Sequence, residues 1–384
     1  MDVNPERELQ EPAANEVPNE PNEQIFVASQ WQLIRWKFLR HKVAVGALIV
    51  ILILYGVAVF AEFVAPYRAD TRHRGYILAP VTRIRFIGED GFRFRPFVYS
   101  YTGRTDPITT QRTYEPDTSR EYLVRFFVRG DSYKLWGLFE TDLHLFGTAE
   151  GGRIFLMGTD MVGRDLFSQV VYGSRVSLSI GLLGVLSSLV LGMILGGISG
   201  FFGGIVDNAI QRLIEILRSF PTLALWMALA AALPREWSQL QVYFAIVLIL
   251  SLMGWTSMGR QVRGKIYSLK NDDFVIAARL SGCSTRRIIG VHLIPSFMSH
   301  IIATLTLAIP GMILGETSLS FLGIGLQRPI VSWGVLLEQA QNIRALMFAP
   351  WLLTPGIFVV VTILAFNFFG DGLRDAADPY ASLE

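Results

Sequence analysis

The chain has 384 residues, of which 51% are hydrophobic and only 17% charged, and its mean hydropathy is +0.40. This composition lies outside the range of soluble domains and indicates an integral membrane protein. A net charge of +2, without basic runs interleaved with aromatic residues, excludes nucleic acid as an expected partner. Because Cys283 is the single cysteine, the sequence also excludes an intramolecular disulfide and a cysteine-based metal site.

The N-terminal region is expected to contain a tail followed by a membrane-surface helix. Residues 1–28 are rich in Glu, Pro and Asn, and their few apolar side chains predict a disordered cytoplasmic tail. Residues 29–42 place Trp31, Ile34 and Phe38 at helical spacing among basic residues. This pattern favours a helix lying flat in the cytoplasmic interface. The alternative is that these charges only flank the next span.

Residues 43–65 form the first expected transmembrane span and complete the segment 29–65. They carry a single acid, Glu62, and are long enough to cross a hydrocarbon core of about 30 Å. A cleaved signal peptide is disfavoured because a long tail precedes this stretch and the stretch exceeds the usual length of such signals.

Residues 66–157 change character and become rich in arginine and aromatic residues. Period-2 stretches on both sides of the turn at residues 88–91 predict strands. The positive-inside rule counts short loops and not a segment of this length, so the arginines do not require a cytoplasmic location. We expect a β-rich extracytoplasmic insert after the first span.

A ladder of small residues marks the second expected span, at about residues 176–202. The small residues recur at every fourth position: Gly184, Ser188, Gly192, Gly196, Gly200 and Gly204. Such spacing lets a neighbouring helix backbone approach closely where lipid supplies no hydrophobic drive for helix association. We therefore expect these six residues to be helix-packing positions, and chance is the alternative.

Four more spans are expected, at residues 212–233, 242–258, 297–322 and 350–369. The first of them is weak, because three charged side chains occupy its start and Pro221 interrupts it. The segment between the last two, which carries the sequence Ser332-Trp333-Gly334, is expected to form a short interfacial helix.

The distribution of charge predicts the orientation in the membrane. Residues 260–295 and the N-terminal flank both carry an excess of Lys and Arg, which places both in the cytosol. With six spans, the C-terminus is then cytoplasmic as well. The expected fold is an all-α polytopic protein of six transmembrane helices, with residues 158–384 forming a core of five spans.

The cytoplasmic loop at residues 260–295 is expected to form a projection held between two membrane helices. Residues 273–287 are predicted to form a short helix within it. The small residues Ala277, Ala278 and Gly282 are expected to leave one low-relief face that fits a partner's groove.

No catalytic or cofactor site is expected in this chain. Residues 259–266 match seven positions of a phosphate-binding loop, but Ile266 stands where Ser or Thr must reach magnesium. Any ATP and magnesium would therefore be bound by partner subunits. The isolated residues His144 and His292 are expected to make local hydrogen bonds, and no metal site is expected.

Glu316 lies in an apolar run, where an ionised carboxylate costs about 2.5–3.5 kcal/mol on insertion scales. It is expected to face the bundle interior or a watery path. Structural pairing and pore lining both remain open for Glu316 and for the neighbouring residues Ser318 and Ser320. Asn367, near the end of the last span, is a further candidate for pore lining, and helix packing explains it better.

Several motifs occur in order along the chain: GTD-x-x-GRD-L, YGSRVSLSIG, RSFPTL, A-A-R-x-x-G, E-x-SLSFLG and FNFFGDGLRDAADP. Together they resemble the C-type permease of the dipeptide/oligopeptide ABC importer family. The resemblance implies a type I-like permease of a bacterial inner membrane. It also implies four partners besides membrane lipid: a second permease subunit, two ATP-binding subunits and an extracytoplasmic solute-binding protein.

The same resemblance implies a cargo and a coupling loop. Peptides or similar small solutes are the expected cargo, and oligosaccharides, opines or metal chelates are the alternatives within the family. Residues 260–295 correspond to the loop that docks on the ATPase, with contacts expected from Asp273, Ala277, Ala278, Arg279, Gly282, Arg286, Arg287, His292 and Pro295.

Two departures from the family pattern stand out. Ile276 replaces the Glu that is usual in the coupling loop, and the insert is longer than the corresponding family segment. A membrane receptor that senses a ligand through this insert is a remote alternative, but it would be expected to carry a cytoplasmic output domain.

Cys283 allows a direct test of the predicted orientation. A membrane-impermeant maleimide should label Cys283 in inside-out vesicles or after permeabilisation, provided that no partner covers it. Labelling from the outside of intact cells would contradict the six-span arrangement.

Overall fold

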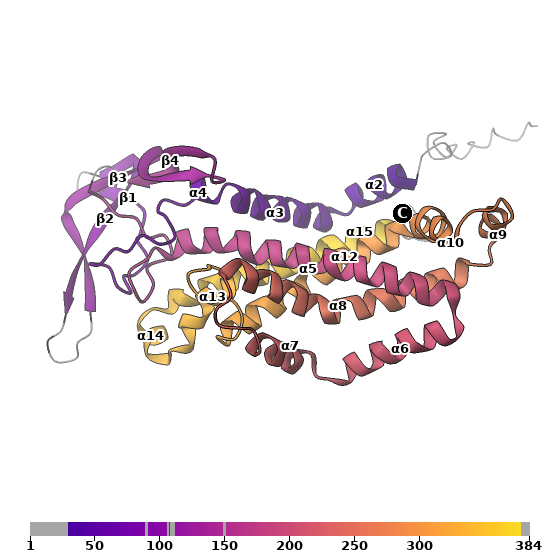
Figure 1. Cartoon of the computed structure of the whole chain (residues 1–384). Coiled ribbons are helices and arrows are strands. Elements are labelled where there is room, and N and C mark those ends of the chain that lie inside the picture. The colour runs from indigo at the N-terminus through magenta and orange to yellow at the C-terminus, as the bar shows by residue number, and fades with distance from the viewer. Residues whose placement is uncertain (1–29, 89–90, 106, 108–111, 149–150, 378–384) are drawn as a thin grey trace, which may run out of the picture.

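The structure is a computed structural model that describes residues 30–88, 91–105, 107, 112–148 and 151–377. A helical bundle forms most of it, and a β-rich insert lies at one end of the bundle (Figure 1). The tail expected at residues 1–28 and the centre of the turn expected at residues 88–91 lie outside the described residues.

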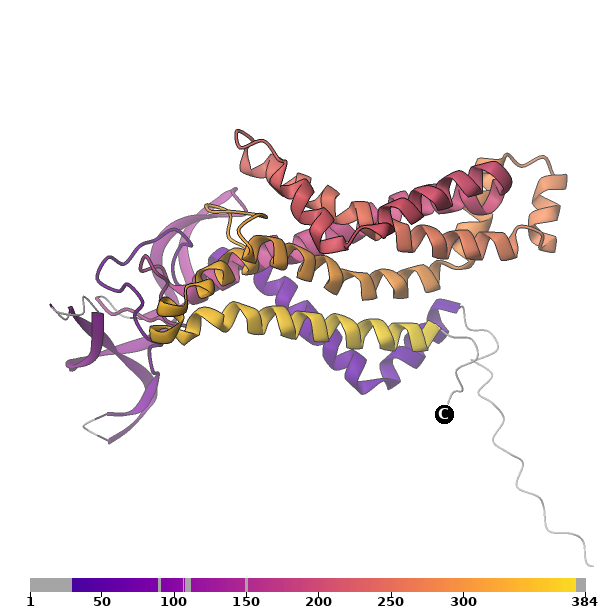
Figure 2. The same cartoon turned by 90° about the horizontal axis from the view of Figure 1, so that it is seen from below.

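The long helices run roughly side by side along the long direction of the molecule (Figure 2). In chain order, the helices of the described residues are α2 Gln30–Arg40, α3 Lys42–Val59, α4 Ala61–Val64, α5 Leu166–Phe202, α6 Gly204–Ser219, α7 Thr222–Ala231, α8 Gln239–Leu269, α9 Asp273–Leu280, α10 Thr285–Arg287, α11 Ile294–Ser296, α12 Met298–Phe321, α13 Trp333–Glu338, α14 Ile343–Phe348 and α15 Thr354–Ala377. A π-helix, Ile288–Leu293, joins α10 to α11.

Among the described residues, five helices are long and apolar enough to cross a membrane: α3, α5, α8, α12 and α15 with the short turn before it. The third expected span, at residues 212–233, is not one straight helix, because α6 and α7 meet at an angle of 85°. Pro221 explains the break, since it donates no backbone N–H and disfavours helical geometry in the residue before it. The count is six only if this bent pair is one broken span.

The small-residue ladder packs α5 against α8 and α12. A Cβ atom on Gly196 would lie 2.4 Å from the carbonyl oxygen of Gly259, and one on Gly200 would lie 2.7 Å from that of Arg263. Gly192 faces α8 in the same way and Ser188 donates a hydrogen bond to the Ser251 carbonyl. Farther along α5, Gly184 contacts Met312 of α12. These five residues therefore lie at the contacts of α5 with α8 and α12.

The prediction for Gly204 is wrong. Gly204 lies beyond the end of α5, has a φ of +55°, and has nothing within 4 Å of the position a Cβ would take. Together with Gly203, which has a φ of +67°, it reverses the chain between α5 and α6. Asp207 of α6 then accepts a hydrogen bond of 2.6 Å from Arg263 of α8, which fixes this corner.

The insert contains the expected strands. β1 Arg85–Gly88, β2 Gly91–Thr105, β3 Arg112–Leu135 and β4 Phe139–Thr148 pair antiparallel in chain order. The predicted first hairpin is present, with Ile87 opposite Phe92.

Polar contacts hold the insert at the end of the first span. Arg175 of α5 donates hydrogen bonds of 2.7 Å to both carboxylate oxygens of Glu62 in α4, the short helix that leads into the insert. His144 of β4 lies 2.6 Å from the Ala65 carbonyl through Nδ1 and 3.0 Å from the Asp131 carbonyl through Nε2. The local hydrogen bonding expected of His144 is confirmed.

Two short helices attach to the bundle differently from each other. α2, the expected membrane-surface helix, packs Ile34 and Phe38 on the end of α15, where the Phe38 and Phe369 rings lie 5.5 Å apart, while Trp31 stays exposed. The prediction that α13 is an interfacial helix is wrong. Its Trp333 is fully buried and donates an Nε1–H bond to the Val170 carbonyl of α5, because α13 packs among α5, α12 and α15.

The α5–α8 contact gives a matched pair of stability tests. Gly196→Ala should lower the free energy of unfolding by about 1–3 kcal/mol, because the new methyl meets a backbone carbonyl that has no room to move. Gly264→Ala, on α8 with open space around it, should leave stability unchanged or slightly raised. Thermal unfolding of the purified protein in detergent measures both, and equal midpoints would contradict the packing role.

Candidate functional site

α9 is the short helix expected in the loop after α8, but it is shorter than predicted. It ends at Leu280 and does not reach Arg287. Gly282 has a φ of +76°, and Cys283 donates its N–H to the Ala278 carbonyl at 3.1 Å. A residue in the left-handed backbone conformation commonly ends an α-helix, and glycine usually takes that position, as Gly282 does here. Gly282 therefore terminates α9 and redirects the chain into α10.

The inner face of α9 belongs to this chain's own core. Val275 is fully buried and Ala278 is 8% exposed, and both pack in a cluster with Ile266 of α8, Ile288 and Leu293. The prediction that Ala278 lies on a partner-facing surface is wrong for this reason. The pattern of small residues alone did not show which side of the helix faces the bundle.

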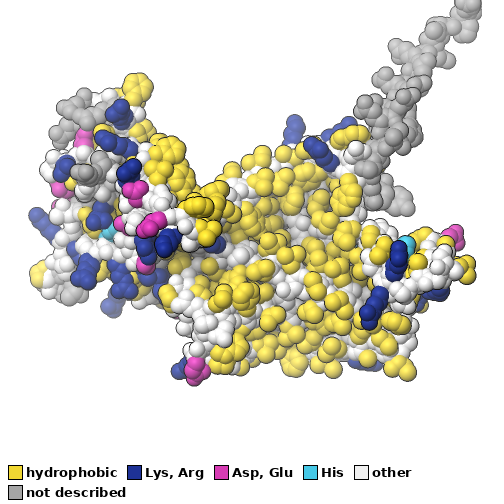
Figure 3. All heavy atoms as spheres, turned by 45° about the horizontal axis from the view of Figure 1, so that its top comes forward, with side chains coloured by type: hydrophobic (Ala, Val, Ile, Leu, Met, Phe, Trp, Pro, Cys, Tyr) yellow, Lys and Arg dark blue, Asp and Glu magenta, His cyan; other side chains and the backbone are white. Residues whose placement is uncertain are grey.

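The outer face of α9 is apolar and exposed. Phe274 is 41% exposed, Ile276 43% and Leu280 84%, and Ala277 lies exposed between them. Phe274, Ile276, Ala277 and Leu280 together form the exposed surface of α9. The space-filling view shows basic side chains gathered around the end of the molecule that carries α9 and α10 (Figure 3).

The other residues expected to contact a partner surround this surface unevenly. Asp273, Arg286 and Arg287 are exposed, and the Arg279 guanidinium lies 5.8 Å from the centre of the Phe201 ring. Pro295 is exposed at the start of α11. His292, expected to make local hydrogen bonds, has a buried Nε2 without a hydrogen-bond partner among the described residues.

Glu316 of α12 forms a fully buried polar centre. Ser320 and Ser332 donate hydrogen bonds of 2.8 and 2.7 Å to its Oε1, and Ser177 of α5 donates one of 3.4 Å to its Oε2. Ser177 in turn accepts the Trp333 N–H at 3.1 Å. The carboxyl group therefore joins α5, α12 and the start of α13, which favours the pairing alternative over pore lining.

The other two polar residues grouped with Glu316 lie apart from its hydrogen bonds. The Ser318 hydroxyl bonds the Leu314 carbonyl of its own helix, and Asn367 is half-buried on α15. Neither is among the residues that bond the Glu316 carboxyl in the described structure.

Asp160 forms a second buried centre, to which sequence reasoning assigned no role. Its side chain has no exposed surface, accepts N–H and Nε–H bonds of 2.9 and 2.8 Å from Arg164, and lies 3.4 Å from Arg328. Burial, with the nearby Arg164 charge, lowers the pKa of Arg328 to about 10, so it remains charged at neutral pH. Asp160 thus ties the start of α5 to the loop after α12. The only sequence signal was the GTD-x-x-GRD motif, because Arg328 is distant in the chain.

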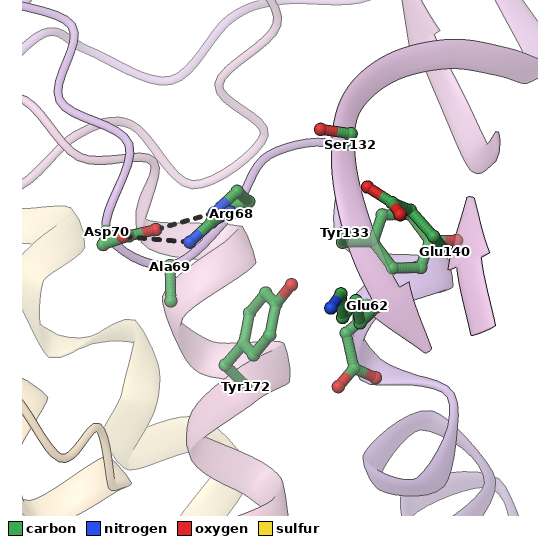
Figure 4. Close-up of a pocket in the computed structure, with 9 residues that line it drawn as sticks. Glu62, Arg68, Ala69, Asp70, Ser132, Tyr133, Glu140 and Tyr172 are labelled. Atoms are coloured by element: carbon green, nitrogen blue, oxygen red, sulfur yellow. Dashed lines mark hydrogen bonds and ion pairs between the residues drawn. The ribbon is translucent and has the colours of Figure 1, made fainter. Parts of the chain in front are cut away.

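A polar pocket of about 460 Å³ lies where the insert meets the bundle (Figure 4). Glu62, Tyr133, Glu140 and Tyr172 line it together with an Arg68–Asp70 ion pair of 3.1 Å. The hydrogen bond from Arg68 lowers the pKa of the Asp70 carboxyl. Within the described residues, no group of His, Cys, Asp and Glu could hold a metal ion.

The residues that match most of a phosphate-binding loop do not form a loop. Residues 259–266 lie within the continuous helix α8. Their backbone N–H groups are therefore committed to helical hydrogen bonds and cannot cradle a phosphate.

Comparison with known proteins gives consistent matches along the chain. Residues 188–382 match the family described as binding-protein-dependent transport system inner membrane component, and residues 29–80 match the N-terminal TM domain of oligopeptide transport permease C. The oligopeptide transport system permease protein OppC of Bacillus subtilis is 39% identical over 223 residues, which span 58% of this chain and 70% of the relative.

Two further matches are to OppC of Escherichia coli K12 and to a solved structure. E. coli OppC is 41% identical over 244 residues, covering 62% of this chain and 78% of that protein. A chain from the MetNI methionine ABC transporter in inward-facing conformations aligns with a TM-score of 0.43 and 17% identity, covering 56% of this chain and 98% of that one.

Two substitutions at Glu316 separate pairing from pore lining. Glu316→Gln should unfold within about 1 kcal/mol of the wild type, because an amide accepts from Ser320 and Ser332 and donates to Ser177. Glu316→Leu should lose about 2–4 kcal/mol, because those hydroxyls remain buried without an acceptor. Thermal unfolding in detergent measures both. Equal stability of the two variants would contradict the pairing role, and a Gln variant that is stable but inactive in transport would favour pore lining.

Proposed function

Because this chain belongs to the family of inner membrane components of binding-protein-dependent transport systems, it is a multi-pass permease subunit of an ABC importer, and we propose that its cargo is a peptide. The relatives that support this cargo are named oligopeptide and dipeptide transport permeases and are 38–41% identical to the chain. Oligosaccharides, opines and metal chelates are the alternative cargoes.

The proposed assembly contains a second permease subunit, two ATP-binding subunits and an extracytoplasmic solute-binding protein. The second permease is supported by the apolar surface left open on the bent pair α6–α7, where Ile205, Leu213, Ile216 and Phe220 are 88%, 46%, 59% and 52% exposed. An apolar surface of this kind is stable only against lipid or another subunit. ATP and magnesium would be held by the ATP-binding subunits, and this chain would contribute no catalytic group.

We propose that Phe274, Ile276, Ala277 and Leu280 form a coupling surface on α9 that contacts the ATP-binding subunits. One observation carries this proposal: Phe274, Ile276 and Leu280 expose apolar side chains, while Val275 and Ala278 on the same helix anchor it to the bundle. An apolar residue surrounded by polar surface is typical of an anchor that enters a partner's pocket. Ile276 would add apolar contact where the family usually has a carboxylate.

The packing of α9 gives a route by which a partner's movement would reach the membrane. α9 rests on Ile266 of α8, α8 is held against α5 by the glycine contacts, and the π-helix after α10 leads into α12. A displacement of α9 would therefore move α8 and α12 as packed bodies. Such rigid-body motion between two arrangements is a common form of switching.

The proposed orientation places α9 and both termini in the cytosol and the insert outside. It is supported by the basic residues around α9 and in α2, which carries Arg35, Lys37 and Arg40. The insert would then form the part of the chain nearest the solute-binding protein.

Leu280→Asp tests the coupling surface with little risk to the fold. Leu280 is 84% exposed, so a carboxylate there is solvated in the free subunit and is desolvated only in a partner's groove. We expect loss of ATP-binding-subunit co-purification and of peptide uptake by membrane vesicles, with an unchanged unfolding temperature of the isolated subunit. Ser268→Asp, exposed on α8, is the matched control and should behave as the wild type.

Ala278→Asp gives the complementary result. Since Ala278 packs inside the chain's own core, this variant should lower the unfolding temperature of the isolated subunit itself.

The coupling surface would be excluded if the Leu280→Asp variant took up peptide and co-purified with the ATP-binding subunits as the wild type does. Uptake of oligosaccharide instead of peptide by an otherwise intact complex would reject only the cargo.

A further inference from the structure

An apolar groove of about 560 Å³ lies between the first span and the hairpin formed by β3 and β4. Ile53, Gly56 and Val57 of α3 form one wall, and Leu135 and Leu143 of the hairpin belong to the other. Almost all of its lining is carbon. Three of the wall residues lie inside the candidate span Lys42–Val59, so the groove is continuous with the apolar surface of that span.

The turn of the same hairpin carries large apolar side chains that nothing in the described structure covers. Leu138 is 75% exposed, Phe139 62% and Trp136 47%. Hydrophobic side chains continue onto the edge of the insert that adjoins the bundle (Figure 3). Exposed Lys134 directly precedes the turn and would suit the level of lipid phosphates.

Trp136 fixes the height of this turn along the bundle. Its indole Nε1 donates a hydrogen bond of 2.8 Å to the carbonyl of Val59, the last residue of α3, and its ring lies 5.5 Å from the ring of Phe60. Tryptophan is enriched at the membrane–water boundary because one end of the ring is apolar and the other donates a hydrogen bond. The turn therefore lies where the first span ends.

The backbone of Trp136 indicates that its side chain determines this position. Its φ of +54° is a region that bulky residues rarely occupy, and a glycine or asparagine would adopt it at lower cost. The contacts of the indole with Val59 and Phe60 offset the cost of this backbone conformation.

We propose that the β3–β4 hairpin dips into the bilayer beside the first span and that the groove holds an acyl chain of a membrane phospholipid. A lipid acyl chain is the occupant that the groove's continuity with the span favours, because the adjoining face of α3 exposes the apolar side chains of Ile49, Leu52 and Ile53, as a lipid-facing span does. The insert is then a membrane-anchored element and not a free domain in the aqueous phase. This inference holds on whichever side of the membrane the insert lies.

The position of the turn can be measured with a nitroxide in the complete transporter reconstituted in liposomes. In a Cys283→Ser background, a spin label at Leu138→Cys should be accessible to oxygen and protected from a water-soluble nickel chelate. A label at Ser119→Cys, exposed elsewhere on β3, should be accessible to the chelate. Accessibility of the Leu138 label to the chelate would place the turn in water, and protection from both reagents would place it against a protein. Either result overturns the proposal.

The groove is tested with phosphatidylethanolamine that carries a photoactivatable diazirine in its acyl chain. Irradiation should attach this lipid to the peptide containing β3 and β4. Gly56→Phe should reduce the attachment several-fold, because Gly56 lines the groove and has open space for a side chain. Gly46→Phe, an equally unhindered position on α3, should not reduce it. No attachment to the hairpin, or equal attachment in both variants, would exclude an acyl chain in the groove.

Discussion

The close approach of α5 to α8 is the contact on which the rest of the structure depends. Gly192, Gly196 and Gly200 allow two backbones to touch over several turns, and a Cβ at Gly196 or Gly200 would lie within 3 Å of an α8 carbonyl oxygen. Lipid offers no hydrophobic gain for bringing helices together, so this packing relies on dispersion and shape. Because α8 is held along its length, α9 at its end has a fixed position.

Buried polar contacts fix the elements that glycine packing does not reach. The Glu316 carboxyl joins α5, α12 and α13 through three serine hydroxyls, and Asp160 joins the start of α5 to the loop after α12. A buried polar group without its partner is costly, so these two centres specify one arrangement of the helices they link. At the other end, a partly exposed ion pair between Asp207 and Arg263 holds α6 to α8.

The features predicted from the sequence were those that depend on local spacing. The small-residue ladder, the strands of the insert and the motifs of the permease family each repeat or occur in order over short distances. The features that were missed depend on residues far apart: the serines around Glu316 come from α5, α12 and the start of α13, and Arg328 reaches Asp160 from the loop after α12. The orientation of Ala278 was missed because helical spacing alone does not identify the face that meets the bundle. Pro221 predicted an interruption but not a bend of 85°.

A photocrosslink from α9 in native membranes tests the proposed coupling role most directly. A photoreactive amino acid replaces Leu280, and the adduct is identified by mass spectrometry. We expect a crosslink to an ATP-binding subunit whose yield changes when nucleotide is added, because α9 would follow the movement of that subunit. Adducts only with lipid or with an extracytoplasmic protein would contradict the coupling role of α9 and the proposed orientation.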